Sequence, residues 1–178
     1  HGIYVSRGEP AQSVPVAAES GIPFVIGAAP VQAASAPAKA SVPVLCESWG
    51  DVETKLGYSE DWDSYNLCEF AYAYFKLYGC KPVVFCNLLD PATMKTAVAA
   101  ADITVVNHQA LLPIGAINDD TLVVKASGDA GEPYVAGTDY MAYYAGENLI
   151  VELLEDGDCY DASAVSISYN QVDPAQIA

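Results

Sequence analysis

His108 and a nearby carboxylate are the residues whose types come closest to a catalytic pair. His108 is the only histidine inside the chain, and Asp102 lies shortly before it. A histidine that is oriented by a carboxylate can act as a general base, but it needs a nucleophile beside it. The chain contains no G-x-S-x-G, H-E-x-x-H or Walker sequence. We therefore interpret His108 as a turn or surface residue and predict that the protein is not an enzyme.

A second candidate for chemistry is the acidic run at residues 155–161, EDGDCYD. Several carboxylates close together could attract Ca²⁺. The run does not have EF-hand spacing, in which ligands alternate along a loop before a distal glutamate. A solvated turn between two strands is the interpretation that we favour, and we predict no metal site and no cofactor.

Five cysteines are spread along the chain, at positions 46, 68, 80, 86 and 159. An odd count without a C-x-x-C pair argues against both a disulfide framework and a zinc site. Free cysteine behaves as a small hydrophobic residue, so the sequence predicts reduced thiols that are mostly buried.

Aromatic side chains gather between Phe70 and Tyr78, where Tyr72, Tyr74 and Phe75 lie between them. Such a group could serve as a stacking platform for bases or sugars. It has few basic neighbours, however, and part of it follows a helical period. We interpret it as a packed helix face whose phenols reach the rim.

Composition excludes several classes of function. Of the 178 residues, 52% are hydrophobic and 17% are charged, and the net charge is −16. The apolar content is too high for a wholly disordered chain. The excess of acids disfavours binding to nucleic acid or to anionic membranes. The charge is uneven, because residues 1–95 carry −4 and residues 96–178 carry −12.

The first half of the chain alternates strand and helix signals. Residues 22–28 and 81–89 predict strands that are buried on both faces, and 43–46 predicts a short strand. Residues 48–57 predict a helix that Ser48 caps and Gly57 ends.

A longer helix is predicted from Ser59, its N-cap. Its apolar residues recur at helical spacing, at Leu67, Phe70, Ala71, Tyr74 and Tyr78. A strand, a helix and a second strand at this spacing indicate a βαβ crossover with parallel strands.

The second half predicts strands and turns. After a short helical link at 92–101, strand patterns follow at 103–107, 121–126, 138–144, 148–154 and 164–169. Turn residues separate them at the spacing of a small antiparallel β-sandwich or barrel. The predicted fold class is therefore α+β.

Several segments resemble one protein family in the order in which they occur. They are HGIYVS (1–6), SGIPFVIGAAPV (20–31), LGYSEDWDSYNLCEFAYAYFKLYGCKPVVFCNLLDP (56–91), DTLVVK (120–125), GTDYMAYY (137–144), LIVELLEDG (149–157) and VSISYNQVDP (165–174). Together they resemble the N-terminal portion of contractile phage tail sheath proteins, of the type found in prophages and tail-like bacteriocins.

The resemblance implies four segments. Residues 1–20 would be an extended arm, 21–95 part of the α/β sheath domain, 96–172 the inserted β-sandwich, and 173–178 a linker towards a C-terminal region. The implied function is structural: subunits polymerise as stacked hexameric rings around a tail tube and contract to drive it through a cell envelope. Neighbouring subunits, tube and baseplate would be the partners, without nucleic acid or membrane insertion. The location would be a virion or tail-like particle assembled in the host cytoplasm.

The implied site is the arm. Ile3, Tyr4, Val5 and Ser6 match the family's inter-subunit arm and would add a strand to a neighbouring subunit. The alternative for this segment is a disordered terminus. The alternative function is a β-sandwich that binds at a surface, such as an adhesion module, with tyrosines of the second half as its contacts.

Overall fold

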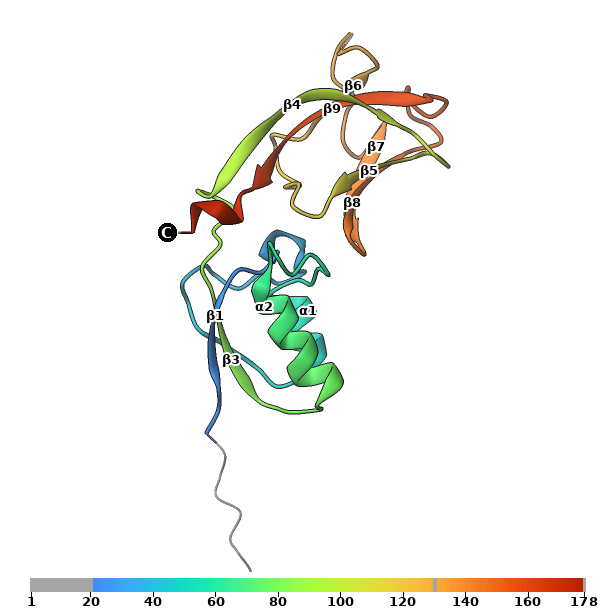
Figure 1. Cartoon of the computed structure of the whole chain (residues 1–178). Coiled ribbons are helices and arrows are strands. Elements are labelled where there is room, and N and C mark those ends of the chain that lie inside the picture. The colour runs from blue at the N-terminus through green and yellow to red at the C-terminus, as the bar shows by residue number, and fades with distance from the viewer. Residues whose placement is uncertain (1–20, 130, 178) are drawn as a thin grey trace, which may run out of the picture.

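The computed structural model describes residues 21–129 and 131–177, so the four arm residues Ile3, Tyr4, Val5 and Ser6 lie outside the described residues. Within these ranges the chain forms two lobes (Figure 1). A sheet with helices makes the first, and two further sheets make the second. The predicted α+β class is confirmed.

The first lobe is built on the sheet β1-β3-β2. Its strands are β1 (Phe24–Gly27), β2 (Val44–Cys46) and β3 (Val83–Asn87). β1 runs parallel to β3, with Phe24 opposite Val84, and β2 runs antiparallel to it on the other side. The predicted crossover between two parallel strands is confirmed.

Helix α1 (Trp49–Lys55) begins and ends as its sequence predicts. The Ser48 hydroxyl accepts a hydrogen bond from the Asp51 N–H at 3.2 Å, and Gly57 follows the helix with a φ of +74°. A serine cap satisfies a free N–H group of the first turn, and glycine adopts the left-handed conformation without strain.

Helix α2 (Asn66–Ala71) begins later than predicted and continues as the π-helical turn η2 (Tyr72–Leu77). The predicted N-cap at Ser59 is wrong, because the helix begins at Asn66. The Ser59 hydroxyl accepts the Asp61 N–H and donates to a residue of the second lobe. The predicted core position of Tyr78 is also wrong, since its side chain is 77% exposed. The wider π turn shifts the helical period, so Tyr78 leaves the face to which Tyr74 belongs.

The second lobe contains two three-stranded antiparallel sheets, β4-β9-β6 and β5-β8-β7. The strands are β4 (Lys95–Thr104), β5 (Gln109–Pro113), β6 (Val123–Ala126), β7 (Tyr140–Ala145), β8 (Asn148–Leu153) and β9 (Ala164–Val172). Short 3-10 turns, η1 (Val31–Ala33) and η3 (Pro174–Gln176), lie near the two ends of the described chain.

The helical link predicted at 92–101 is wrong, because β4 occupies most of it. Its alanines favour a helix, but pairing with β9 from Lys95↔Val172 to Thr104↔Ala164 satisfies the backbone instead. In Figure 1 this long pair runs from the boundary between the lobes into the sandwich.

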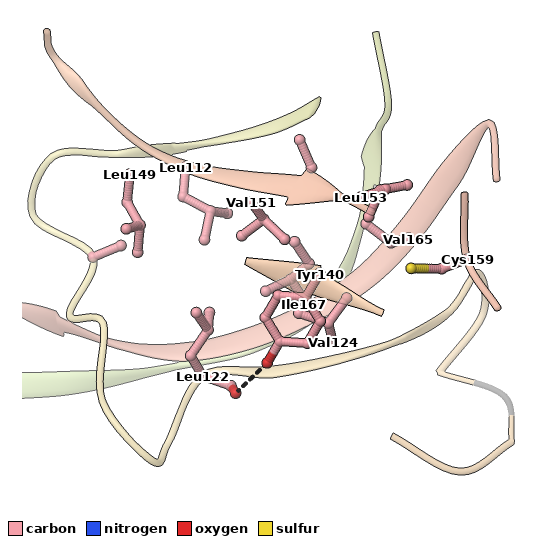
Figure 2. Packing of buried hydrophobic residues seen from close by; sticks show 12 residues of the cluster. Leu112, Leu122, Val124, Tyr140, Leu149, Val151, Leu153, Cys159, Val165 and Ile167 are labelled. Carbon is pink, nitrogen blue, oxygen red and sulfur yellow. Dashed lines mark hydrogen bonds between the residues drawn. The ribbon is translucent and has the colours of Figure 1, made fainter. Parts of the chain in front are cut away.

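The core of the sandwich lies between its two sheets (Figure 2). The inward side chains alternate with outward ones most regularly along β5 and β8, whereas three successive residues of β9, at 165–167, are all buried. The core side chains include Leu112, Val124, Tyr140, Leu149, Val151, Leu153, Val165 and Ile167. The Tyr140 hydroxyl donates to the Leu122 carbonyl oxygen at 3.5 Å, so the phenol is paired inside an apolar core.

Among the described residues, no helix has both the length and the apolar character needed to cross a bilayer.

Candidate functional site

Among the described residues, helices cover one face of the first-lobe sheet and leave the other without a helix (Figure 1). Val25, Val44, Cys46, Val83 and Phe85 pack with α1 and α2 in one core. Their neighbours along each strand point the other way, because side chains alternate across a sheet. We call this second surface the open face; it consists of Phe24, Ile26, Leu45, Val84 and Cys86.

The open face is apolar, and it is solvent-exposed at its two outer strands, whereas Cys86 on the central strand is buried. Phe24 and Ile26 are each 54% exposed and Leu45 is 42% exposed. The strand pairing places Phe24, Val84 and Leu45 in one row across the sheet. The prediction that residues 22–28 are buried on both faces is therefore wrong for the described chain, because helices cover only one of the two faces.

Charge is absent from the open face. None of the three strands contains a charged residue. The acidic side chains of this lobe belong mainly to the helices and the turns beside them: Glu47, Asp51, Glu53, Glu60, Asp61, Asp63 and Glu69. A contiguous apolar surface without charge is typical of an interaction surface.

The two lobes are joined by a small apolar core and by polar bonds. Tyr65 and Leu89 of the first lobe pack with Ile114, Ile117 and Val172 of the second. At one side of this core the carboxylate of Glu147 accepts hydrogen bonds from the Ser59 hydroxyl at 2.6 Å and the Glu60 N–H at 3.0 Å. Ser59 is fully buried, so its hydroxyl needs this partner. We call this arrangement the lobe joint.

Sequence reasoning missed both the open face and the lobe joint. A strand with apolar residues on both faces gives no signal of which face lacks a cover. Glu147 lies in the turn between β7 and β8 and belongs to no motif, so nothing in the sequence marks its contact with Ser59.

His108 lies in a tight turn next to β5, as predicted. Its φ is +61°, and its ring stacks on Tyr160 with centroids 4.0 Å apart. Its Nδ1 atom lies 3.0 Å from the Tyr160 carbonyl oxygen. Asp102 is bonded elsewhere, to the Ser127 hydroxyl and the Gly128 N–H, and these donors lower the pKa of its carboxyl. The structure therefore does not bring His108 and Asp102 together as a catalytic pair.

The acidic run at 155–161 forms turns between β8 and β9, in line with the interpretation that we favoured. Asp158 donates its N–H to the Asp139 carboxylate, which also accepts the Val135 N–H. These two backbone donors lower the pKa of Asp139. Over residues 21–129 and 131–177, no three His, Cys, Asp or Glu side chains gather as a metal ion would require.

The aromatic group of the first lobe packs among itself. The ring of Tyr72 lies near Tyr58, Trp49 and Trp62, at centroid distances of 6.4, 6.3 and 5.8 Å. Lys76 lies over the Trp49 ring at 4.6 Å. Phe70, Tyr74 and Phe75 also contact one another, as expected for a packed helix face, whereas Tyr78 is exposed.

An open cleft of ≈590 Å³ lies where the lobes meet. Lys39, Asp90, Asn118 and Tyr144 contribute polar atoms to its lining. The Tyr144 hydroxyl is already bonded to the Ala116 carbonyl oxygen and the Asn118 N–H. These bonds give the Tyr144 hydroxyl a structural role in the cleft.

No protein-family model, no curated protein and no solved structure matches the chain.

Proposed function

We propose that this chain is a structural subunit of a contractile tail sheath. In this proposal the subunits polymerise as stacked hexameric rings around a tail tube and contract to drive the tube through a cell envelope. Support comes from the order of the segments that resemble sheath proteins and from the apolar open face. The particle would be a phage or a phage tail-like device assembled in the host cytoplasm.

The open face is the observation on which the proposal depends most. Phe24, Ile26 and Leu45 expose apolar surface that carries an energetic cost in water of about 25 cal/mol for each Å². A protein that functions alone rarely retains such a face on a core sheet. A subunit whose sheet is completed by other polypeptide gains that energy on assembly.

The lobe joint suits the mechanical part of the proposal. A contracting lattice moves whole subunits past one another, so each subunit must transmit force without bending. The bonds from Ser59 and Glu60 to Glu147 and the shared apolar core couple the sandwich to the helix-covered lobe. Movement would then occur between subunits.

The charge distribution suits a sandwich that faces solvent on the assembled tail. The segment 96–178 carries −12 of the net charge of −16. Like charge on an outer layer keeps assembled particles apart in solution. The tube and the baseplate would be reached through parts of the subunit other than this layer.

The arm residues Ile3, Tyr4, Val5 and Ser6 supply the connection between subunits in this proposal. An apolar strand that adds to the sheet of a neighbour gains a row of main-chain hydrogen bonds. Such pairs can persist while the weaker contacts between subunits change during contraction.

Negative-stain electron microscopy of the purified chain, in its full-length protein where one exists, tests the proposal. Hollow striated tubes or stacked rings are the expected particles. A monodisperse monomer at all concentrations would contradict the proposal.

Deletion of residues 1–10 tests the role of the arm. We expect the shortened chain to remain in the supernatant under conditions in which the intact chain sediments as polymer. Its far-ultraviolet circular dichroism should stay that of a folded β-rich protein, because the described sandwich core, which includes Leu149 and Val151, is built from residues of the second half of the chain. Equal polymer yield from both chains would rule out the arm as the connector.

A β-sandwich that binds at a surface is the second candidate. Leu111 and Met141 are exposed on the outward face of the sheet β5-β8-β7, where Ile150 and Tyr143 lie in the same row as Leu111. An apolar and aromatic surface of this kind fits a glycan or a protein ligand. Binding of the monomeric chain to a glycan array, without polymer formation, would favour this candidate over the sheath.

A further inference from the structure

We propose that copies of this chain associate head to tail, with one end of the first lobe of one copy docked on the far end of the sandwich of the next. This inference names a contact for the self-assembly in the proposed function, and it therefore rests on that proposed function. It follows from apolar side chains and unlike charges that the fold exposes at two opposite ends.

The first docking surface is the turn at residues 76–81, which follows α2 and η2; we call it the basic turn. All six residues are exposed, and the exposed fraction is 63% for Leu77 and 77% for Tyr78. Lys76 and Lys81 flank these two side chains. In the part of the chain that the structure describes, neither lysine forms an ion pair with a carboxylate. The basic turn therefore presents apolar surface between two positive charges.

Hydrogen bonds of its own backbone order the basic turn. The Tyr78 N–H donates to the Ala73 carbonyl oxygen at 3.0 Å, and the Cys80 N–H donates to the Tyr74 carbonyl oxygen at 2.8 Å. Gly79 has a φ of +61°, which allows the chain to reverse at this point. A surface that is ordered before contact loses less conformational entropy when a partner docks on it.

The second docking surface lies at the end of the sandwich away from the lobe joint; we call it the acidic end. Val106, in the turn between β4 and β5, is 63% exposed there. His108 of the same turn stacks on Tyr160, which places Val106 close to the turns between β8 and β9. Four residues of those turns are exposed and form no ion pair within the described ranges: Glu155, Asp156, Asp158 and Asp161. The acidic end thus complements the basic turn, because both expose apolar surface and their charges are opposite.

The two surfaces lie at opposite ends of the described chain (Figure 1). α2 begins next to Tyr65 in the lobe joint and β3 leads back to the joint at Leu89, so the basic turn between them lies at the free end of the first lobe. β8 leads away from Glu147 in the joint, and β9 leads back to Val172. The acidic end, between β8 and β9, therefore lies at the free end of the sandwich. Surfaces at opposite ends cannot meet within one copy, so a contact between them joins two copies.

A contact between two different surfaces leaves one of each free at the ends of the assembly. Further copies can then add in the same way, and such a contact closes into a ring or continues as a helical filament. Both arrangements are compatible with stacked rings. Only the end of the sandwich is used, so its other surfaces remain free to face solvent.

The net charge of −16 does not prevent this contact. Two copies repel each other at long range, but salt at physiological concentration screens charges beyond about 8 Å. At the contact itself, lysines of the basic turn meet carboxylates of the acidic end. Burial of Leu77 and Tyr78 against Val106 removes apolar surface from water and adds to the attraction.

Reversing the charges on either surface tests the contact. One variant combines Lys76→Glu with Lys81→Glu, and the other combines Asp156→Lys with Asp158→Lys. We expect each to weaken association by about tenfold or more in sedimentation velocity runs over a range of concentrations, because like charges then face each other. The second variant separates this effect from net charge. Each of its two substitutions adds +2, so its net charge is −12 against −16, and general repulsion would decrease.

The chain that carries all four substitutions supplies the decisive comparison. Its basic turn is acidic and its acidic end is basic, so unlike charges meet again and association should return to the wild-type level. Lys39→Glu is the matched control for Lys81→Glu alone, since it reverses another exposed lysine of the first lobe. It should leave association nearly unchanged. Circular dichroism of every variant shows whether it folds.

The apolar part of the contact has its own test. Leu77→Ala and Val106→Ala should each weaken association several-fold, because each removes apolar surface from one side of the contact. Val42→Ala is the matched control, since Val42 is 50% exposed in the first lobe but lies outside both surfaces. Equal association of the three variants would show that these side chains are not in the contact.

The outcomes distinguish this inference from the proposed function. Equal polymer formation by the wild-type chain and both charge-reversed variants would overturn the head-to-tail contact and leave the sheath proposal standing. Weak association of a folded chain with all four substitutions would overturn the contact as well. Open filaments without hollow tubes, lost on each reversal and restored by the combination, would support the contact and contradict the sheath. A wild-type chain that is monomeric at all concentrations would contradict both.

Discussion

The carboxylate of Glu147, in the turn between β7 and β8, lies 2.6 Å from the hydroxyl of the buried Ser59 in the first lobe. This pair ties the tip of a sandwich hairpin to the segment that leads into α2, and Glu60 adds its N–H to the same carboxylate. It is the clearest polar link between the lobes and can be tested alone.

Replacing Glu147 with alanine should destabilise the protein by about 1–2 kcal/mol, because the Ser59 hydroxyl and the Glu60 N–H both lose their acceptor. The free energy of unfolding from urea titrations measures this loss. Glu155→Ala is the matched control, since Glu155 is exposed in a turn of the same lobe. Equal stability of the two variants would show that the hydrogen bonds to Glu147 contribute nothing.

Truncation of Leu149 in the sandwich core should cost about 2–5 kcal/mol, because Leu149→Ala removes buried apolar surface and leaves a cavity. Leu111→Ala, on the paired strand β5 but facing outward, should cost far less. Thermal unfolding of both variants gives the comparison. A similar loss for both would contradict the assignment of the inner and outer faces.

Gly57→Ala should destabilise the protein by more than about 1 kcal/mol, since Gly57 has a positive φ and an added Cβ would collide with the carbonyl oxygen of Pro30. Gly128→Ala is the control, because Gly128 also has a positive φ but has open space around it. The urea midpoint of each variant is compared with that of the wild-type chain. Because both glycines have a positive φ, the extra loss for Gly57→Ala measures the collision with Pro30. An equal cost for both would show that the contact with Pro30 relaxes freely.

Asp51, in the first turn of α1, should make stability depend on pH in the acid range. The ammonium group of Lys55 bonds to its carboxylate, and with the Glu47 N–H and the Ser48 hydroxyl it lowers the pKa of Asp51 to about 2. A lowered pKa means that the folded state favours the ionised form. The stabilisation is therefore complete above pH about 4 and is lost as the pH falls towards 2.

Urea unfolding of the wild-type chain and Asp51→Asn at a series of pH values tests this dependence. We expect the wild-type chain to be the more stable at neutral pH and the difference to shrink between pH about 4 and about 2. A difference that stays constant across this range would show that the ionisation of Asp51 does not contribute.

Thiol labelling should distinguish Cys80 from the other cysteines. Cys80 is exposed, whereas the other four are buried. Burial raises the pKa of Cys46 to about 11 and that of Cys68 to about 12, so their thiolate fractions at neutral pH are very small. Labelling with a disulfide reagent should show one fast thiol, and Cys80→Ser should abolish it. A second fast thiol in that variant would contradict the burial of the rest.

Local patterns predicted the parts of the fold that depend on neighbouring residues. Ser48 and Gly57 mark the ends of α1 correctly because a cap and a left-handed glycine act within one turn. The strands β8 and β9 follow from the alternation of apolar residues, and the parallel pair β1 and β3 follows from a helix between two apolar runs.

The parts that depend on distant residues were not predictable from local patterns. Ala-rich β4 is a strand because β9 pairs with it, and the Ser59 hydroxyl donates to Glu147, which is distant in the sequence. The open face has the same origin: Phe24 and Val25 are equally apolar in the sequence, but only Val25 meets the helices. A hydropathy pattern records which residues prefer burial and cannot tell whether the described chain supplies the cover.

Lys95, the first residue of β4, is paired with Val172, the last residue of β9, at one end of the ladder between the two strands. Beside this pair, the Thr96 hydroxyl donates a hydrogen bond to the Asp173 carboxylate. Paired residues on antiparallel strands lie only about 5 Å apart. The first and last residues of the sandwich therefore lie next to each other, as the two ends of a loop do. Evolution or an engineer could exchange it for a tight hairpin or for a foreign domain with adjacent ends, and the helix-covered lobe would keep its own strand order.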